Sequence, residues 1–362
     1  MSKQSQRQHR PGCLEFFAGS GLVSYALRDY FEVKWANDIC AKKGEVYRAN
    51  HGAQHFHLGS IANVRGADLP PAALSWASFP CQDLSLAGNT AGIHASRSGL
   101  VWEWLRVLDE MPLRPAVLTA ENVAGLVSAN QGAHYRALHH ALQARGYRAG
   151  ALLLDAVRWL PQSRPRVFVI ALRADIAPPP ELCAAGPQWP HPAPIQQAAA
   201  GLQDWIWWRL PAPPARTQDL ADLIEWDAPC QQGAGAAHDL SLIAPAHKAR
   251  LQSLGDCVAP GYKRTRNGRQ VLELRFDGVA GCLRTPGGGS SRQYLVLQKQ
   301  GRLHSRLLTA RETARLMGAP EHYQLPGSYN AAYKAMGDAV AAPVAAWLAQ
   351  HLLLPLARLH EA

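Results

Sequence analysis

Residues 13–31, with the sequence CLEFFAGSGLVSYALRDYF, decide the fold of this chain. Residues 13–17 have the length of a buried strand and are apolar apart from Glu15, Gly19 and Gly21 mark a tight turn, and the apolar spacing of 22–31 is helical. A strand, a glycine turn and a helix in this order indicate a parallel sheet covered by helices. Glycines in such a turn let the backbone approach a ligand closely at the carboxyl end of the strand.

The rest of the chain extends this pattern and then departs from it. Further strand-like runs lie at 33–37, 73–79, 116–120 and 166–172, with a helical segment at 100–111. Residues 175–200 and 211–215 are rich in Pro and Ala, 256–300 are basic and strand-like with a turn at Asn267-Gly268, and helical spacing returns from 307. We therefore expect a large α/β domain with helices on both faces of its sheet, a smaller inserted domain, and a C-terminal helix that returns to the first domain.

Composition limits the classes of protein to consider. The 362 residues are 48% hydrophobic, enough for a sizeable core, and a net charge of +10 suits a polyanionic partner without proving one. Seven cysteines without a C-x-x-C pair argue against a disulfide framework and against a metal site. The sequence has no long uninterrupted apolar run, so we expect no membrane span.

The glycine turn alone has two interpretations: it binds a nucleotide-like cofactor, or it is a plain tight turn. Ser24 occupies the third glycine position of G-x-G-x-x-G, so the dinucleotide-binding pattern fails and a dehydrogenase is disfavoured. Asp38 ends the next strand, where a carboxylate accepts hydrogen bonds from ribose hydroxyls or caps the following helix.

Polar and reactive side chains follow three more strands. Cys81 comes after the strand at 73–79 and is either an accessible nucleophile or an inert buried thiol. Glu121 and Asn122 close the strand at 116–120, where a carboxylate is costly unless it is paired or functional. Arg164 and Arg166 precede the strand at 166–172 and share one face of an extended segment.

Taken in order, these motifs resemble one family. The series FAGSG (17–21), ND (37–38), PCQ (80–82), ENV (121–123) and QSRPR (162–166) is similar to the motifs of cytosine-5 DNA methyltransferases. Two C-terminal segments, RLLTARETARLMGAPEHY (306–323) and YKAMGDAVAAPVAAWLAQHL (333–352), also resemble that family. The resemblance covers residues 11–175 and 303–352. It implies a Rossmann-like class I methyltransferase sheet in residues 1–175, completed by the helix at 330–362, and a target-recognition domain at 176–329.

The resemblance also implies a mechanism. Cys81 would add to C6 of a cytosine that is flipped out of duplex DNA, so that C5 becomes nucleophilic. Glu121 would bind N3 and the exocyclic amine, Arg164 would hold O2, and Arg166 would steady the base or the surroundings of Cys81. Gln82 and Asn122 would position the substrate, and residues 82–97 would form a lid.

The methyl donor implied is S-adenosylmethionine, which leaves as S-adenosylhomocysteine, with no metal. The residues that match the family's cofactor site are Phe17, Gly19, Gly21, Asp38, Ile39, Ser60, Ile61, Leu100 and Asp338. Asp38 would bind the ribose, Ile39 and Leu100 would lie beside the adenine, and Asp338 near the methionine end. Ser60 stands where an aspartate is usual and Asp338 where an asparagine is usual, which bears on affinity.

The expected partner is double-stranded DNA. Basic residues of the inserted domain suit phosphate and guanine contacts, and the candidates are Lys263, Arg264, Arg266, Arg284 and Arg292. A monomer in the cytoplasm, at the nucleoid in a prokaryote, is expected, and a separately acting restriction endonuclease is compatible with the family. Two alternatives stay open: a transfer-RNA cytosine-5 methyltransferase with the same Cys81 and Glu121, and a non-catalytic DNA-binding relative.

Overall fold

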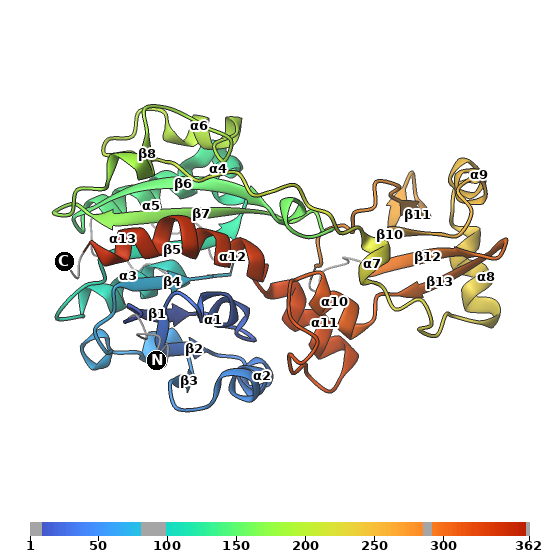
Figure 1. The fold of residues 1–362 in the computed structure, drawn as a ribbon, viewed down its shortest axis with the longest axis horizontal. Helices are drawn as coiled ribbons and strands as arrows, with labels where there is room; N and C mark the ends of the chain where they lie inside the picture. The colour runs from blue at the N-terminus through green and yellow to red at the C-terminus, as the bar shows by residue number, and fades with distance from the viewer. Residues whose placement is uncertain (1–8, 81–98, 285–291, 360–362) are drawn as a thin grey trace, which may run out of the picture. The chain divides into compact units, whose positions relative to one another are not determined.

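The computed structural model describes residues 9–80, 99–284 and 292–359 and divides the chain into two compact units (Figure 1). The first unit comprises Met1–Leu154, Pro165–Ala212 and Ala345–Ala362, and the second comprises Asp155–Arg164 and Pro213–Val344. The units change over at residues 212 and 344, whereas the sequence analysis placed the limits of the inserted domain at 176 and 329. Which unit catalyses and which recognises DNA stays a prediction.

A seven-stranded sheet forms the centre of the first unit, in the order β3-β2-β1-β4-β5-β7-β6 (Figure 1). Its strands are β1 Gly12–Phe16, β2 Glu32–Asp38, β3 Phe56–Leu58, β4 Leu74–Ala77, β5 Val117–Val123, β6 Tyr147–Asp155 and β7 Pro165–Arg173. The first five run parallel, so the predicted sheet is confirmed there. β7 is antiparallel to β5, which a run of apolar residues does not reveal because it carries no information on strand direction.

Helices cover both faces of this sheet because successive side chains of a strand point to opposite faces. Leu14 and Phe16 lie in a core with the buried face of α3 (Leu100–Asp109) and with α5 (Ala133–Gln143). α3 buries Val101, Trp104, Leu105 and Leu108, which have helical spacing. Trp104 also donates from its indole nitrogen to the Ser75 hydroxyl on β4 at 3.0 Å, which fixes the helix against the sheet.

The opposite face of β1 meets the first two helices, α1 (Leu22–Leu27) and α2 (Ala41–His51). Ala18, Ala36, Tyr47 and Phe56 form a small core there. The remaining elements of the first unit are α4 Gly125–Ser128, α6 Ala193–Ala199, β8 Cys183–Ala184 and β9 Trp207–Trp208. The predicted fold class, an α/β sheet with helices on both faces and a smaller additional unit, is confirmed.

The second unit contains a four-stranded antiparallel sheet, in the order β11-β10-β12-β13. Its elements are β10 Cys257–Arg266, β11 Arg269–Leu274, β12 Gln293–Lys299, β13 Arg302–Leu307, α7 Leu220–Leu223, α8 Gly233–Ser241, α9 Pro245–Ser253, α10 Ala310–Arg315 and α11 Tyr329–Asp338. The predicted turn at Asn267-Gly268 joins β10 to β11, with φ of 48° and 74°. Positive φ at both positions is what a two-residue hairpin turn requires.

The last helical stretch of the chain, Tyr329–Arg358, is long and apolar enough to cross a membrane by length and composition. It includes α12 Ala342–Leu348, the π-helical turn Ala349–Leu353 and α13 Leu354–Arg358. Its most apolar window is 56% buried inside the structure. A core helix of a globular protein passes the same test, so the stretch is weak evidence for a membrane span.

Candidate active site

The glycine turn after β1 has a backbone that few residues other than glycine adopt. Gly19 and Gly21 have φ of 58° and 89°, and Phe17, at 58°, shares the left-handed region. A Cβ atom on Gly21 would lie 2.6 Å from the ring of His51 and 2.9 Å from that of Tyr47, so this position admits no larger residue unless those side chains move. The turn is therefore held in one conformation with its backbone exposed to a close approach.

Asp38, at the end of β2, connects this turn to the start of α2. Its carboxylate accepts hydrogen bonds from the backbone N–H of Gly19 at 2.8 Å and of Cys40 at 2.8 Å. The N-cap residue of α2 is Cys40, so Asp38 is not itself the cap. A carboxylate has about four acceptor positions, and these two bonds leave acceptor capacity for hydroxyl groups of a ligand.

The apolar residues expected around an adenine ring lie in different surroundings. Ile39 is 72% exposed, whereas Ile61 is buried in the same core as Leu14 and Phe16. Leu100 is half-buried and begins α3. Ser60 caps the short helix Ile61–Asn63, since its hydroxyl accepts from the N–H of Ala62 at 3.3 Å.

Asp338 is the last residue of α11 and lies in the second unit, where it is exposed. Cys81 and Gln82 fall outside the described residues, as does the rest of the expected lid to residue 97. The structure does describe the residues that lead into Cys81. Ser78 donates its N–H to the carbonyl of Phe16 at 3.3 Å.

Asn122 joins the strand that leads into Cys81 to the strand that carries Glu121. Its amide nitrogen donates to the carbonyl of Phe79 at 2.9 Å, and its amide oxygen accepts from the N–H of Val123 at 2.9 Å. β4 lies between β1 and β5 in the sheet, with all three strands parallel. The segment before Cys81 thus lies between the glycine turn and Glu121, as the sequence motifs require.

Glu121 and Arg166 form an ion pair at this edge of the sheet. The Nε atom of Arg166 lies 3.2 Å from Oε1 of Glu121, whose side chain is 9% exposed. The register explains the pairing, because Val123 on β5 lies opposite Arg166 on β7. A nearly buried carboxylate is expensive unless it is paired, and Arg166 supplies the pair.

Arg164 has different partners from Arg166. It precedes β7 and belongs to the second unit. Its guanidinium donates to the carbonyls of Leu283 at 3.1 Å, Gly337 at 2.8 Å and Ala339 at 2.6 Å, and the residue is 2% exposed. Both arginines were expected on one face of an extended segment; β7 begins at Pro165, between them.

Gln162 acts beside Arg164, and the sequence analysis did not select it. Its amide nitrogen donates to the carbonyl of Leu316 at 2.6 Å, and its amide oxygen accepts from the N–H of Leu283 at 3.1 Å. Together the two side chains hold the segment 283–284 against the end of α10 and the end of α11. The QSRPR motif (162–166) contains both residues, so it could have pointed to Gln162 as well as to Arg164.

The predicted DNA-contacting residues of β10 are engaged in ion pairs. Lys263 is paired with Asp239 at 2.5 Å, and Arg264 and Arg266 share Glu273 at 3.0 Å and 2.5 Å. Arg284 is exposed, and Arg292 donates to the side-chain oxygen of Asn330 at 2.7 Å. Exposed pairs such as those of Glu273 contribute little, so a phosphate can exchange for them, whereas the buried Asp239 holds Lys263 in place.

A buried polar network beneath the glycine turn was missed by the sequence analysis. Glu15 on β1 is 1% exposed, and burial raises the pKa of its carboxyl group from 4.5 to about 8. It accepts a hydrogen bond from the Ser24 hydroxyl, which lies 2.6 Å from the hydroxyl of Tyr47. The other carboxyl oxygen has no hydrogen-bond partner among the described residues. Burial lowers the pKa of the neighbouring His51 to about 4, so that imidazole is neutral near Gly21.

These observations define a class of protein. A sheet of this order, with a glycine turn after β1, a carboxylate at the end of β2 and a paired acid near the end of β5, is the Rossmann-like sheet of a class I methyltransferase. A crystal structure of the S. pombe Dnmt2 methyltransferase has the same fold, with a TM-score of 0.59, 20% identity, and coverage of 95% of this chain and 98% of that chain.

The chain belongs to the C-5 cytosine-specific DNA methylase family, whose model matches residues 12–353. It is similar to the type II methyltransferase M.HhaI of Haemophilus parahaemolyticus, with 26% identity over 348 residues that cover 94% of this chain and 93% of M.HhaI. The type II methyltransferase M.Bsp6I of Bacillus sp. is 24% identical over 343 residues, which cover 93% of this chain and 96% of M.Bsp6I. The predicted family and enzyme class, a DNA cytosine-5 methyltransferase, are confirmed.

Proposed function

We propose that the methylation of DNA cytosine by this chain proceeds through a covalent bond between Cys81 and C6 of a flipped-out base. The observation that carries this proposal is the hydrogen bond from Asn122 to the carbonyl of Phe79, two residues before Cys81. It ties the segment that leads to the nucleophile to β5, the strand that carries Glu121. A nucleophile and an acid at neighbouring strand ends suit addition to an electron-poor ring.

The acid–base part of the mechanism is assigned to Glu121 and Arg166. Addition of the Cys81 thiolate to C6 moves an electron pair toward N3, and Glu121 hydrogen-bonds N3 and supplies its proton. The C5 atom is then an enamine-like carbon that accepts the methyl group. A base then takes the C5 proton, Cys81 departs as a thiolate and the N3 proton returns to Glu121, which restores the aromatic ring and leaves 5-methylcytosine.

The two arginines take different roles in this scheme. The 3.2 Å pair with Glu121 supports Arg166 as the arginine that meets the base. The sequence analysis gave the contact with O2 to Arg164, but its donors serve backbone carbonyls. We therefore assign Arg164 a positioning role and assign O2 to Arg166, with Gln82 and Asn122 as positioning residues.

The residues around the glycine turn fit S-adenosylmethionine, the methyl donor that the family implies. Gly21 has no room for a side chain, Asp38 has free acceptor positions for ribose hydroxyls, and Ile39 offers an exposed apolar surface for a flat ring. When bound, the donor would supply its methyl group from a sulfonium centre. The further residues of this site are proposed to be Phe17, Gly19, Ser60, Ile61, Leu100 and Asp338.

DNA recognition is assigned to the second unit. Exposed cations suit phosphate contacts, whose number sets the salt dependence of binding. We propose contacts from Arg264, Arg266, Arg284 and Arg292, and a structural role for Lys263 with Asp239. A monomer in the cytoplasm, located at the nucleoid in a prokaryotic host, acts on the duplex. The relatives are named type II methyltransferases, which supports a separately acting endonuclease as a further partner.

The test is transfer of labelled methyl groups to duplex DNA and, in parallel, to transfer RNA. Label is expected in DNA, and the Cys81→Ser variant should lose transfer while it still binds DNA. Cys183→Ser, a half-buried thiol on β8, is the matched control and should keep its activity. Label confined to transfer RNA would favour the RNA alternative, and label in neither would favour the non-catalytic one.

A second measurement tests the covalent step. A duplex with 5-fluorocytosine at the target has no C5 proton to lose, so release of the enzyme is blocked. We expect an adduct that survives denaturing electrophoresis with the native chain and none with Cys81→Ser. Sequencing of DNA from cells that express the chain identifies the target for this duplex. An active enzyme that gave no adduct would contradict the covalent scheme.

A further inference from the structure

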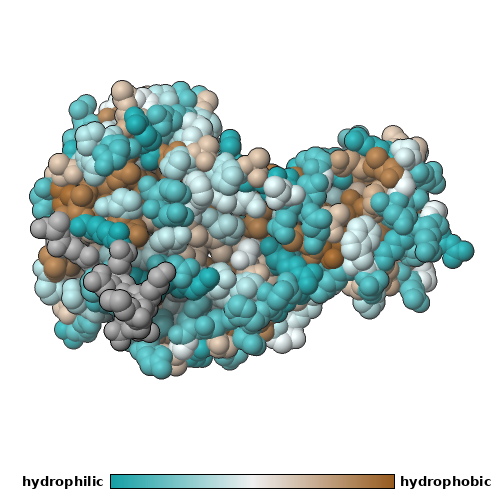
Figure 2. Space-filling view, in the orientation of Figure 1, coloured by the Kyte–Doolittle hydropathy of each residue, from teal (hydrophilic) through white to brown (hydrophobic). Residues whose placement is uncertain are grey.

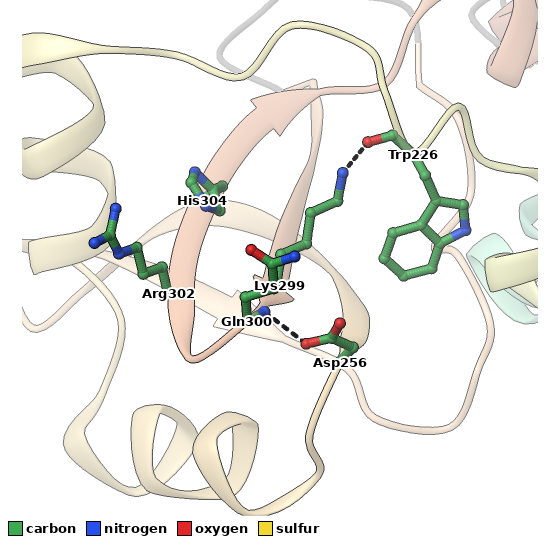
Figure 3. Close-up of a pocket in the computed structure, with 6 residues that line it drawn as sticks. All are labelled: Trp226, Asp256, Lys299, Gln300, Arg302 and His304. Atoms are coloured by element: carbon green, nitrogen blue, oxygen red, sulfur yellow. Dashed lines mark hydrogen bonds between the residues drawn. The ribbon is translucent and has the colours of Figure 1, made fainter.

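A pocket of about 820 Å³ lies in the second unit, at the turn that joins β12 to β13 (Figure 3). Its lining residues are Trp226, Asp256, Lys299, Gln300, Arg302 and His304. Trp226 follows α7, Asp256 precedes β10, and the other four come from the hairpin. Figure 2 shows a hydrophilic surface at the tip of this hairpin.

The walls of the pocket are joined to one another. Gln300 and Gly301 form the two-residue turn, with φ of 47° and 76°. The N–H of Gln300 donates to the carboxylate of Asp256 at 2.7 Å, and the ammonium of Lys299 donates to the carbonyl of Trp226. Both flanking segments are thus tied to the hairpin, and Figure 3 shows Arg302 and Trp226 on opposite sides of Lys299.

Three basic side chains of the hairpin share one face of the sheet. Lys299 lies directly opposite Arg302 in the register, so their side chains are on the same face. His304, two residues after Arg302, points to that face too. Like charges that lie opposite each other on a sheet are destabilising. Among the described residues, neither Lys299 nor Arg302 forms an ion pair with a carboxylate.

The neighbouring hairpin provides a contrast. Arg266 lies opposite Arg269 at the end of the β10–β11 hairpin, which is the same arrangement of like charges. There the carboxylate of Glu273 neutralises Arg266 at 2.5 Å. At the β12–β13 hairpin the only nearby acid among the described lining residues, Asp256, accepts from the backbone of Gln300. Among the described residues, the cations at the tip of the β12–β13 hairpin therefore have no carboxylate at ion-pair distance.

We propose that this pocket binds a nucleoside phosphate. The phosphate would lie between Arg302, His304 and Lys299, which are all donors to anionic oxygens. The base would stack on the indole of Trp226, and Asp256 and Gln300 would hydrogen-bond its edge. The volume lies within the range of about 300–1,000 Å³ that is usual for small-molecule sites. The nucleoside phosphate can be a free nucleotide or part of a DNA strand. In the second case it is a nucleotide outside the recognised sequence, and this possibility rests on the proposed function.

The first experiment measures binding of free ligands to the full chain by calorimetry. Saturating S-adenosylhomocysteine is present, so that nucleotides do not enter the cofactor site. Deoxynucleoside monophosphates should bind, more tightly than inorganic phosphate. Arg302→Ala should weaken nucleotide binding by on the order of tenfold, and Arg269→Ala, on the other hairpin, should leave it unchanged. No binding at millimolar nucleotide, or equal binding by Arg302→Ala, would overturn the proposal.

The Trp226→Ala variant separates the contribution of the base to binding affinity from the contribution of the phosphate. Because a base stacked on an aromatic side chain contributes to binding, nucleotide affinity should fall by on the order of tenfold in this variant. The affinity for inorganic phosphate should stay the same in this variant. If both affinities fall equally, or if phosphate alone binds as tightly as nucleotides, the pocket does not take a nucleoside.

A second experiment identifies the source of the ligand. Methyl transfer is compared on a duplex limited to the target sequence and on one with long flanks. If the source is DNA, Arg302→Ala should raise KM severalfold on the long duplex only and should lower the salt slope of binding by about one. If Arg302→Ala has the KM of the native chain on both duplexes, while the native chain binds nucleotides in calorimetry, the ligand of the pocket is a free nucleotide. A chain that methylated no nucleic acid would refute the proposed function, while the calorimetry would still decide the pocket.

Discussion

Replacement of Glu15 with glutamine should stabilise the chain, and the gain should grow with pH. Burial raises the pKa of Glu15 to about 8 in the folded chain, against 4.5 for an ordinary glutamate. Below pH 4.5 the carboxyl group is protonated in both states and costs nothing. As pH rises toward 8, the unfolded chain loses this proton and the folded chain keeps it, so stability falls.

The size of this effect follows from the two pKa values. One unit of difference corresponds to about 1.4 kcal/mol, so the full penalty is roughly 5 kcal/mol. It amounts to about 1 kcal/mol at pH 5, about 3 kcal/mol at pH 7, and nearly the full value above pH 8. Glutamine keeps an acceptor for the Ser24 hydroxyl but never ionises. Burial lowers the pKa of His51 to about 4 in both chains, so its contribution to the pH dependence is the same in each and cancels in the difference.

Urea unfolding of the native chain and of Glu15→Gln between pH 5 and 8.5 measures the difference. The free energy of unfolding of the variant should exceed that of the native chain by an amount that rises by about 3–4 kcal/mol over this interval. Glu32→Gln, at an exposed position on the same sheet, should show no such slope. A difference that is flat with pH would refute the reasoning, because it would mean that the buried carboxyl group has an ordinary pKa.

Three further changes test the site. Gly21→Ala should weaken S-adenosylhomocysteine binding at least tenfold in calorimetry, because its Cβ would meet the His51 ring. Gly186→Ala, whose Cβ would have no atom within 4 Å, should bind normally, and equal binding by both variants would refute the role of the turn. Arg166→Lys should lower kcat by on the order of 100-fold with little change in KM for DNA, since a single ammonium does not replace the guanidinium fork; a change confined to KM would contradict this. Arg164→Lys should lower the free energy of unfolding by about 2–4 kcal/mol in denaturant titration, because buried carbonyls lose their donors; unchanged stability would show that these bonds contribute nothing.

Structural elements that depend on residues close together in the chain could be predicted from the sequence. The strand and glycine turn at 13–21 and the hairpin at Asn267-Gly268 depend on residues close together in the chain, and both were predicted correctly. The direction of β7 was not predicted, because an apolar run has the same composition in either orientation. The order of the family motifs supplied the expected site residues, although Cys81 itself lies outside the described part of the chain.

Partners distant in sequence were not predictable. Glu15 was interpreted as part of a strand, but its environment depends on Ser24 and Tyr47, which come from two different helices. Lys263 was predicted to contact DNA as a basic side chain of the inserted domain, and its pairing with Asp239 becomes visible only when β10 and α8 are in place. Pairings of this kind are set by tertiary packing, which composition and spacing do not encode.

The second unit is assembled from two separate stretches of the chain, and this matters for engineering. Residues 155–164 contribute Gln162 and Arg164, whose bonds hold Leu283 from the longer stretch. A chimera in which only residues 213–344 are transferred into a relative would lack Gln162 and Arg164. The corresponding residues of the relative would take their place. Grafting of a new sequence preference should therefore succeed only when the short stretch is exchanged together with the long one.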